Sequence, residues 1–409
     1  MKGSVEKRGE NSYRLIVSGG FDSQGKRIIH RKTVQVEGKT DRSKKKNAEN
    51  ELAKFLAEIE RGEFYDVKNI KLKDFADMWL TKYGKHNLAK RTYIRYEELI
   101  NNRIIPDLGH KKLTEIRPHQ LIKFYDSLQE EGARKDGKKG GLSPTTIIQI
   151  HRILSSMYNT AVRWEMAHSN PVERVKPPKK KRVEVDYYDE AQTEKLVKAL
   201  REEPLKYQVF ITLALVTGAR RGELAALEWT DIDFEGSIIN INKSAHYIEG
   251  EGMSLSETKN THSDRKVSVP DFAIDLLKEY RKQWLEIKLK IGDKWQEKDD
   301  LSQDYLETWE GKELLFTTWN GWPVHINSLS KWFRKFLERH DLPRIKLHAL
   351  RHTAATLFIA WGIPTRTVSQ ILGHARTSTT QDIYAKSLET VEQVASRRMH
   401  EAFGKSENQ

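Results

Sequence analysis

The spacing of apolar residues changes twice along this chain of 409 residues, and no other feature constrains its fold as strongly. Near the amino terminus, residues 12–18 and 27–36 are rich in β-branched and apolar residues and flank a turn with Gly and Asp, which predicts adjacent strands. From residue 72 to residue 164 apolar residues recur at helical spacing only. From residue 188 onward both patterns occur. We therefore expect a multidomain α+β fold with a small amino-terminal β-sheet plus helix, a helical domain, and a mixed, mainly helical domain.

The first part, residues 1–66, is predicted to be a three-stranded sheet with one helix over residues 44–61. The predicted helix has one apolar face, made by Ala48, Leu52, Phe55, Leu56 and Ile59. Between residues 1 and 46 there are 13 Lys and Arg residues against 5 Asp and Glu. A ribbon of strands with this charge fits the major groove of DNA, whereas a solvated basic surface is the plainer interpretation.

Four helices are predicted in the second part, residues 71–170. Two of them begin at a proline, Pro118 and Pro144, which is a favoured first helical residue. An Asn-Pro pair ends this pattern, and residues 171–186 are predicted to be a basic linker because they contain the extended, charged segment Lys-Pro-Pro-Lys-Lys-Lys-Arg. Such a linker suits contact with a DNA backbone, or is simply solvated.

The charge balance predicts a polyanionic partner. Lys and Arg number 71 and Asp and Glu 58, a formal charge of +13, while a hydrophobic content of 37% and ten Trp exclude a disordered polycation. The lack of cysteine excludes disulfide frameworks, thiol catalysis and zinc sites made of thiolates. No apolar run is long enough to span a membrane and the amino terminus lacks the apolar core of a signal peptide, so we expect a soluble, cytoplasmic protein with no membrane partner.

Four short motifs in residues 187–409 place basic and hydroxyl side chains where a core gives no reason for them. They are Thr217-Gly-Ala-Arg-Arg-Gly-Glu-Leu224, His348-Ala-Leu-Arg-His-Thr353, Leu372-Gly-His-Ala375 and Thr379-Thr-Gln-Asp-Ile-Tyr384. Each motif alone is a weak signal. Their order is specific, because His-x-x-Arg follows the first motif by about 130 residues, Gly-His follows that arginine by 22, and the tyrosine follows that histidine by ten.

This order and spacing resemble the tyrosine recombinase family, the phage and transposon integrases, along the whole chain. The resemblance implies an arm-type DNA-binding domain at 1–66, a helical, SAM-like core-binding domain at 71–170, an interdomain linker at 171–186, and a catalytic domain with a carboxy-terminal tail helix at 187–409. It implies a site-specific DNA recombinase, or integrase, that cleaves and rejoins strands through a covalent 3′-phosphotyrosine intermediate and integrates or excises a mobile element or prophage. The implied catalytic residues are Arg220, Lys259, His348, Arg351, His374 and Tyr384.

The two arginines and the second histidine suit the phosphate. Attack on a phosphodiester builds negative charge on its equatorial oxygens, which guanidiniums bind bidentately at any working pH without a metal ion. Arg220 and Arg351 take this role, and His374 donates a hydrogen bond to the scissile phosphate.

The remaining three residues suit the proton transfers. Tyr384 is the nucleophile, and because a phenol is a poor nucleophile at neutral pH, His348 is assigned as its base. Lys259 is assigned as the acid that protonates the leaving 5′-hydroxyl. Lys259 lies in a predicted hairpin turn where Arg265 and Lys266 compete for the same role.

A metal site and other roles for the neighbouring residues are less consistent with the sequence. His348, His352 and His374 could suggest zinc, but the segment lacks the metalloprotease glutamate and its arginine would repel a cation. We therefore expect no metal and no cofactor. Glu223 is expected to be a buried partner that orients basic residues, and Arg221 and His352 to serve the structure.

Two other functions stay open. A type IB topoisomerase-like enzyme would use the same residues to nick and reseal one strand, and a DNA-binding regulator would not cut at all. The expected partners are double-stranded DNA at core and arm attachment sites, three further copies of the chain in a homotetramer on DNA, and accessory DNA-bending and directionality proteins. A short amphipathic helix predicted from about residue 388 to residue 403 needs a surface to dock on, which the resemblance places on a neighbouring protomer and the simpler alternative on its own domain.

Overall fold

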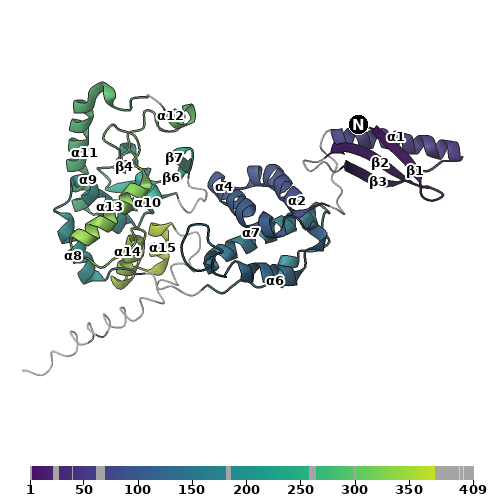
Figure 1. The fold of residues 1–409 in the computed structure, drawn as a ribbon. Helices are drawn as coiled ribbons and strands as arrows, with labels where there is room; N and C mark the ends of the chain where they lie inside the picture. The colour runs from purple at the N-terminus through teal and green to yellow at the C-terminus, as the bar shows by residue number, and fades with distance from the viewer. Residues whose placement is uncertain are drawn as a thin grey trace, which may run out of the picture. The chain divides into compact units, whose positions relative to one another are not determined.

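The structure is a computed structural model that describes residues 2–21, 27–38, 40–60, 70–180, 186–257, 264–298 and 301–373, together with Ser396 and Met399 (Figure 1). The chain divides into two compact units, residues 1–182 and 183–409. Among the residues described, no helix is long and apolar enough to cross a membrane. The predicted turn at 22–25 and most of the segment between 62 and 70 lie outside the described residues.

The amino-terminal part is an antiparallel sheet of order β1-β2-β3 with one helix packed on it. Its elements are β1 (Lys2–Lys7), β2 (Ser12–Phe21), β3 (Arg27–Gln35) and α1 (Asp41–Glu60). Leu15 and Val17 of β2 pack against Phe55 of α1, and all three are fully buried. Strand β1 has one apolar residue, Val5, and therefore gave no strand pattern of its own.

The predicted four helices are present in the second part, but the first two are interrupted. The first continues from α2 (Leu72–Trp79) through a π-helical turn, η1 (Leu80–Gly84), into α3 (Lys85–Asn87). The second continues from α4 (Lys90–Leu99) through a π-helical turn, η2 (Ile100–Ile104), into α5 (Ile105–Leu108). The short helix η3 (Leu113–Glu115), α6 (Pro118–Ser127), α7 (Pro144–Arg163) and η4 (Pro171–Arg174) follow.

The start of the predicted linker differs from the expectation. Residues 171–174 form a 3-10 turn rather than extended chain, and Val172 and Val175 are buried in the core of the helical part. The Asn170 side chain caps this turn by accepting a hydrogen bond from the Val172 amide at 2.9 Å. Val172 and Val175 explain why this segment is not an extended linker, because both valines bury their side chains against the helices.

The second unit contains α9, a helix whose residues from 209 to 216 are apolar apart from one threonine. From its start to the last strand, its elements are α8 (Glu190–Leu200), α9 (Leu205–Thr217), α10 (Arg221–Ala225), η5 (Trp229–Asp231), β4 (Ile232–Asp233), β5 (Ile238–Ile241), β6 (Lys243–Ile248), β7 (Gly252–Glu257) and β8 (Arg265–Ser268). The helices that follow are α11 (Asp271–Ile291), η6 (Gly292–Lys294), α12 (Gln303–Trp309), α13 (Ile326–Arg339), α14 (Ala349–Ala360) and α15 (Thr365–Leu372). Strands pair in the orders β4-β5-β8 and β6-β7. Val209, Ile211 and Leu213 of α9 are buried in the largest core of the chain.

Candidate functional site

The turn between α9 and α10 positions Arg220. Gly218 ends α9 in the left-handed conformation, with φ of 58°. A Cβ atom at this position would lie 2.3 Å from a methyl carbon of Leu372, so both the backbone conformation and the space favour glycine. The chain then re-enters a helix at Arg221, which places Arg220 at the N-cap of α10.

The Arg220 side chain is held at two points. Its Nη1 donates to Oε1 of Glu223 at 2.6 Å, and its Nη2 donates to the carbonyl oxygen of Gly373 at 3.3 Å. The side chain is still 39% exposed. Arg220 is therefore oriented by the protein while part of its guanidinium faces solvent.

Glu223 is the buried partner that the sequence predicted, and it binds a second arginine. Its side chain is 3% exposed, and its Oε2 accepts from Nη2 of Arg265 at 2.9 Å. Burial alone would raise the pKa of Glu223, but the cations of Arg265 and Arg220 outweigh burial and hold its pKa below the usual value. The carboxylate therefore stays ionised and links α10 to β8.

Arg265 and Lys266, the alternatives to Lys259 as the acid, are neighbours on β8, and their side chains point to opposite faces of the strand. Arg265 is buried and ion-paired with Glu223, whereas Lys266 is exposed on the opposite side of the strand. Arg265 is therefore not available as a proton donor at an open site, which removes it as an alternative. Lys259 itself lies outside the described residues.

Arg351 lies in the first turn of α14 and is 5% exposed. Its Nη1 donates to the carbonyl oxygen of Gly218 at 2.8 Å. Its Nη2 is buried and, within the described part of the chain, has no hydrogen-bond partner. Burial and the nearby cation of Arg220 lower the pKa of Arg351 to about 9. Among the described residues, the site thus holds a desolvated cation with one donor that has no acceptor.

His348 lies one turn before Arg351, at the N-cap of α14. Although the residue has an exposed edge, burial of the rest of its ring lowers its pKa from 6.5, and the cations of Arg351, Arg220 and Arg221 lower it further. Glu223 opposes this shift. The imidazole is therefore neutral near neutral pH and can accept a proton.

Three of the six predicted catalytic residues, Arg220, His348 and Arg351, are thus brought together. Lys259, His374 and Tyr384 lie outside the described residues, although Gly373, which contacts Arg220, directly precedes His374 in the sequence. Arg221 donates to Ser330 Oγ at 2.5 Å, and His352 packs edge-on against His348 with ring centroids 5.6 Å apart. Within the described ranges, no group of three His, Asp or Glu side chains is placed to hold a metal ion.

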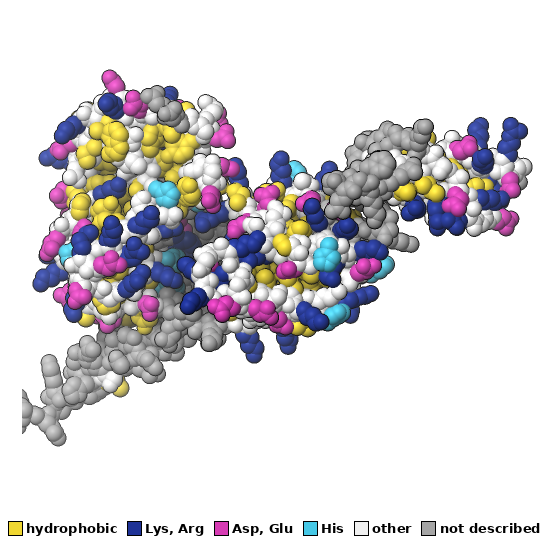
Figure 2. All heavy atoms as spheres, viewed as in Figure 1, with side chains coloured by type: hydrophobic (Ala, Val, Ile, Leu, Met, Phe, Trp, Pro, Cys, Tyr) yellow, Lys and Arg dark blue, Asp and Glu magenta, His cyan; other side chains and the backbone are white. Residues whose placement is uncertain are grey.

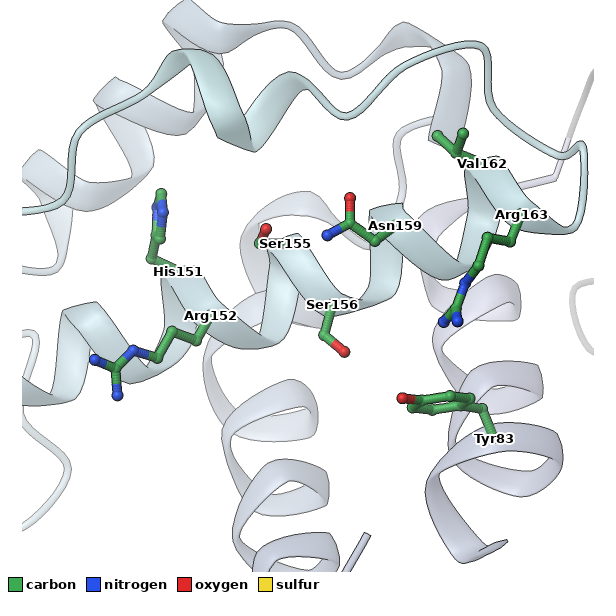
Figure 3. A pocket seen from close by; sticks show the side chains of 8 residues that line it. All are labelled: Tyr83, His151, Arg152, Ser155, Ser156, Asn159, Val162 and Arg163. Carbon is green, nitrogen blue, oxygen red and sulfur yellow. The ribbon is translucent and has the colours of Figure 1, made fainter. Parts of the chain in front are cut away.

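A second candidate site is a polar groove on the helical part, which sequence reasoning missed (Figure 3). Its volume is about 920 Å³, and its lining is mostly polar and basic: Tyr83, His151, Arg152, Ser155, Ser156, Asn159, Val162 and Arg163. All but Tyr83 come from α7. Their recurrence every three or four residues opposite the buried face of α7 was the signal that could have revealed the groove.

Several contacts hold Arg163 at one end of this groove. The Arg163 guanidinium lies over the Tyr83 ring, 5.7 Å from its centroid, and its Nη2 donates to Thr160 Oγ1 at 3.1 Å. The same hydroxyl oxygen accepts from Nε1 of the buried Trp79 at 3.1 Å. A cation held in this way, beside small hydroxyl and amide side chains, suits phosphates and base edges.

A third candidate site is the face of the amino-terminal sheet that α1 does not cover. The buried residues of β2 point toward α1, so the alternate residues Arg14 and Ile16 point to the open face. The strand register places Thr33 and Arg31 of β3 opposite them. On the face drawn in Figure 2, Lys and Arg side chains lie on the amino-terminal part, on the helical part and on the second unit.

Sequence comparisons place this chain among proteins that rearrange DNA. The profile of the Phage integrase family matches residues 186–390, and that of the phage integrase N-terminal SAM-like domain matches residues 71–129. A tyrosine recombinase XerC-like protein of Caldanaerobacter subterraneus subsp. tengcongensis is 31% identical over 398 residues, 94% of each chain. The ICEBs1 integrase of Bacillus subtilis is 26% identical, covering 93% of this chain and 95% of the relative.

Solved structures share the fold. The Tn1549 transposon integrase in complex with a circular intermediate DNA matches with a TM-score of 0.63 at 18% identity, over 81% of this chain and all of that one. A lambda integrase dimer bound to a COC′ core site matches with a TM-score of 0.52 at 17% identity, over 93% of each chain. The expected fold class, including its small sheets and the SAM-like helical part, is confirmed.

Proposed function

Because the chain belongs to the phage integrase family of tyrosine recombinases, we propose that it is a site-specific recombinase that cleaves and rejoins DNA through a covalent 3′-phosphotyrosine intermediate. In this proposal it integrates and excises a mobile element or prophage in the cytoplasm, on the nucleoid. Its accessory partners are DNA-bending and directionality proteins.

The observation that best supports the proposal is the state of Arg351. This cation is desolvated, and within the described residues it makes no ion pair and leaves Nη2 unbonded. A buried cation without a carboxylate partner is costly, so its retention beside Arg220 is best explained by an anionic ligand. A tetrahedral phosphate, which can accept from both guanidiniums, fits this arrangement.

We assign each residue the step that its chemistry allows. Arg220 and Arg351 bind the two non-bridging oxygens of the scissile phosphate and stabilise the charge of the transition state. The neutral imidazole of His348 accepts the proton of Tyr384 as the phenolic oxygen attacks phosphorus. Lys259 protonates the departing 5′-oxygen, and His374 donates to the phosphate.

Trapping on nicked DNA separates this proposal from the two alternatives. A duplex nicked near the cleavage point loses its short 5′-hydroxyl fragment after attack, so the covalent protein–DNA adduct accumulates. A recombinase gives the adduct and joins strands from two different duplexes. An adduct without exchange between duplexes favours a topoisomerase-like enzyme, and no adduct favours a DNA-binding regulator.

The acid side of the pH profile should report His348. We expect the second-order rate constant of adduct formation to fall as the pH is lowered from about 7 to about 5, because a protonated imidazole cannot accept the tyrosine proton. Since the pKa of His348 is held below 6.5, the midpoint of this fall in rate should lie below pH 6.5.

The same depressed pKa makes the free energy of unfolding rise with pH up to about 6.5, since the unfolded chain binds the proton more tightly.

The measurement is adduct yield against time at limiting DNA in buffers of equal ionic strength, for the native protein and His348→Gln. The variant should react slowly and lose this acid limb. A midpoint at or above 6.5, or an unchanged limb in the variant, would contradict the assignment of His348 as the base.

The open face of the amino-terminal sheet should provide a second DNA address. We expect Arg14→Gln with Arg31→Gln, like deletion of residues 1–66, to remove binding to distal arm sites and to keep binding at the crossover core. Lys54→Gln on α1 is the matched control, because it removes a charge from an exposed residue away from that face. Footprinting on the ends of the element measures binding at the arm sites and at the core site. Each lost phosphate contact should lower the slope of log binding constant against log salt concentration by about 1. Equal loss of core binding would refute separate addresses.

We further propose that four protomers join two duplexes and that the tail couples them. Removing residues 388–409 should leave a monomer that binds a single core site but does not recombine. Gel shifts with one site and with paired sites measure the two properties. Full recombination by the truncated protein would exclude coupling through the tail, whereas loss of single-site binding would favour docking of the tail on its own domain.

A further inference from the structure

Arg265 occupies an unusual place at the start of β8. Its side chain is 6% exposed, and the buried guanidinium has hydrogen-bond partners within the protein. Nη2 donates to Glu223 at 2.9 Å and Nε donates to the carbonyl oxygen of Ile371 at 2.6 Å. One guanidinium therefore joins three segments that are far apart in the sequence: α10, β8 and the carboxyl end of α15.

The end of α15 is shaped to this guanidinium. Gly373 follows α15 in the left-handed conformation, with φ of 64°. A Cβ atom at Gly373 would lie 2.9 Å from Nη1 of Arg265 and 3.2 Å from its Cδ. The chain can therefore turn here only because the residue lacks a side chain, and it turns in contact with Arg265.

The same groups that bind Arg265 also bind Arg220. Glu223 accepts from both arginines through its two carboxylate oxygens, at 2.6 Å and 2.9 Å. Arg220 in turn donates to the carbonyl oxygen of Gly373 at 3.3 Å. The contacts form a closed circuit from Arg220 through Glu223 and Arg265 to the end of α15, and back to Arg220.

Such a circuit fixes two parts of the candidate active site relative to each other. Arg220 is partly exposed and would otherwise sample several rotamers, and the carboxyl end of α15 leads directly to the Gly-His motif. Lysine could not replace Arg265, because a single ammonium on a flexible stem lacks the planar fork that reaches Glu223 and Ile371 together. Small displacements of groups that bind a reacting phosphate are costly to the rate.

We propose that Arg265 is a positioning residue for strand cleavage, which holds the carboxyl end of α15 against Arg220 through Glu223. It does not touch the phosphate. The proposal rests on the proposed recombinase function for its effect on cleavage, but its structural part can be measured without any reaction.

The first test is hydrogen exchange in the full-length protein. Arg265→Lys should speed the exchange of backbone amides in residues 368–373, at the end of α15. The matched control is Lys243→Gln, which breaks another partly buried ion pair of the same unit, with Glu228 and Asp231. Faster exchange at 368–373 in Arg265→Lys alone supports the proposal. Unchanged exchange there, or an equal rise in the control, overturns it whether or not the protein cuts DNA.

The second test is single-turnover adduct formation at saturating nicked DNA. Arg265→Lys should react about 10- to 100-fold more slowly than the native protein, with DNA affinity within about twofold, because the positions of bound groups change while the site keeps its charge. Lys243→Gln should react at the native rate below its unfolding midpoint. A native rate in Arg265→Lys despite a lower Tm overturns the proposal, because that is the behaviour of a merely structural residue.

A second variant guards against misfolding of the first. Gly373→Ala disturbs the same contact from the other side, so it should reproduce both the faster exchange and the slower cleavage. If Arg265→Lys unfolds and Gly373→Ala folds with native exchange at 368–373, the proposal fails. If the native protein forms no adduct, the recombinase function fails, while the exchange data still decide whether Arg265 holds the end of α15.

Discussion

Tyr384→Phe is expected to abolish the covalent protein–DNA adduct while the affinity for core DNA stays nearly unchanged. The substitution removes one hydroxyl group, the proposed nucleophile, and leaves every basic side chain in place, so the electrostatic part of binding is preserved. Adduct on nicked duplex and the dissociation constant on intact duplex measure the two effects. The native protein should form the adduct in EDTA as well, because arginines supply the positive charge in the proposed mechanism.

Another tyrosine of the same unit provides the matched control. Tyr247 on β6 packs against His325 with ring centroids 4.4 Å apart, a contact that Phe would keep. Tyr247→Phe should therefore form the adduct at the native rate. An adduct that persists in Tyr384→Phe would show that another residue attacks the phosphate, and the assignment of the nucleophile would be wrong.

The sequence predicted elements well where one face of a regular element is buried. The helix expected over 44–61 is observed at Asp41–Glu60, and the helices expected to begin at Pro118 and Pro144 are observed at Pro118–Ser127 and Pro144–Arg163. The predictions were weakest where apolar periodicity is absent or is not the deciding force. Strand β1 lies at the edge of the sheet and is mostly polar, so it shows no alternation of apolar residues. The π-helical turns η1 and η2 have about one more residue per turn than an α-helix, and the kinds of amino acid do not change there.

The candidate site shows the same division. Local motifs identified Arg220, His348 and Arg351 as candidate site residues, because glycines and histidines stand at fixed spacings from them in the sequence. The ion pair of Arg265 with Glu223 left no sequence pattern, because the two residues are 42 positions apart and meet only in the folded chain. Sequence alone therefore treated Arg265 as a competitor of Lys259, whereas burial assigns it to the interior.

Arg351→Met should change activity and stability in different directions. We expect adduct formation to fall by about three orders of magnitude or more, as when a charge-stabilising arginine is removed from phosphoryl-transfer enzymes. The thermal unfolding midpoint should stay the same or rise. At neutral pH the free protein carries a buried cation whose pKa is lowered to about 9, and methionine fills similar space without that cost. The lost hydrogen bond to Gly218 opposes this gain by only about 1–3 kcal/mol.

Arg265→Met is the matched comparison, because it removes another buried guanidinium from the same unit. Its loss deprives the buried carboxylate of Glu223 of one partner, so its Tm should fall, and breaking such a pair typically costs about 3–5 kcal/mol. Calorimetry or circular dichroism on both variants decides the point. If Arg351→Met lowered Tm as much as Arg265→Met does, Arg351 would already have an anionic partner within the protein, and its unused donor could not be kept for DNA. A stable Arg351→Met protein that binds core DNA but does not cut it would instead mean that the cost of burying Arg351 is recovered only when a phosphate enters the site.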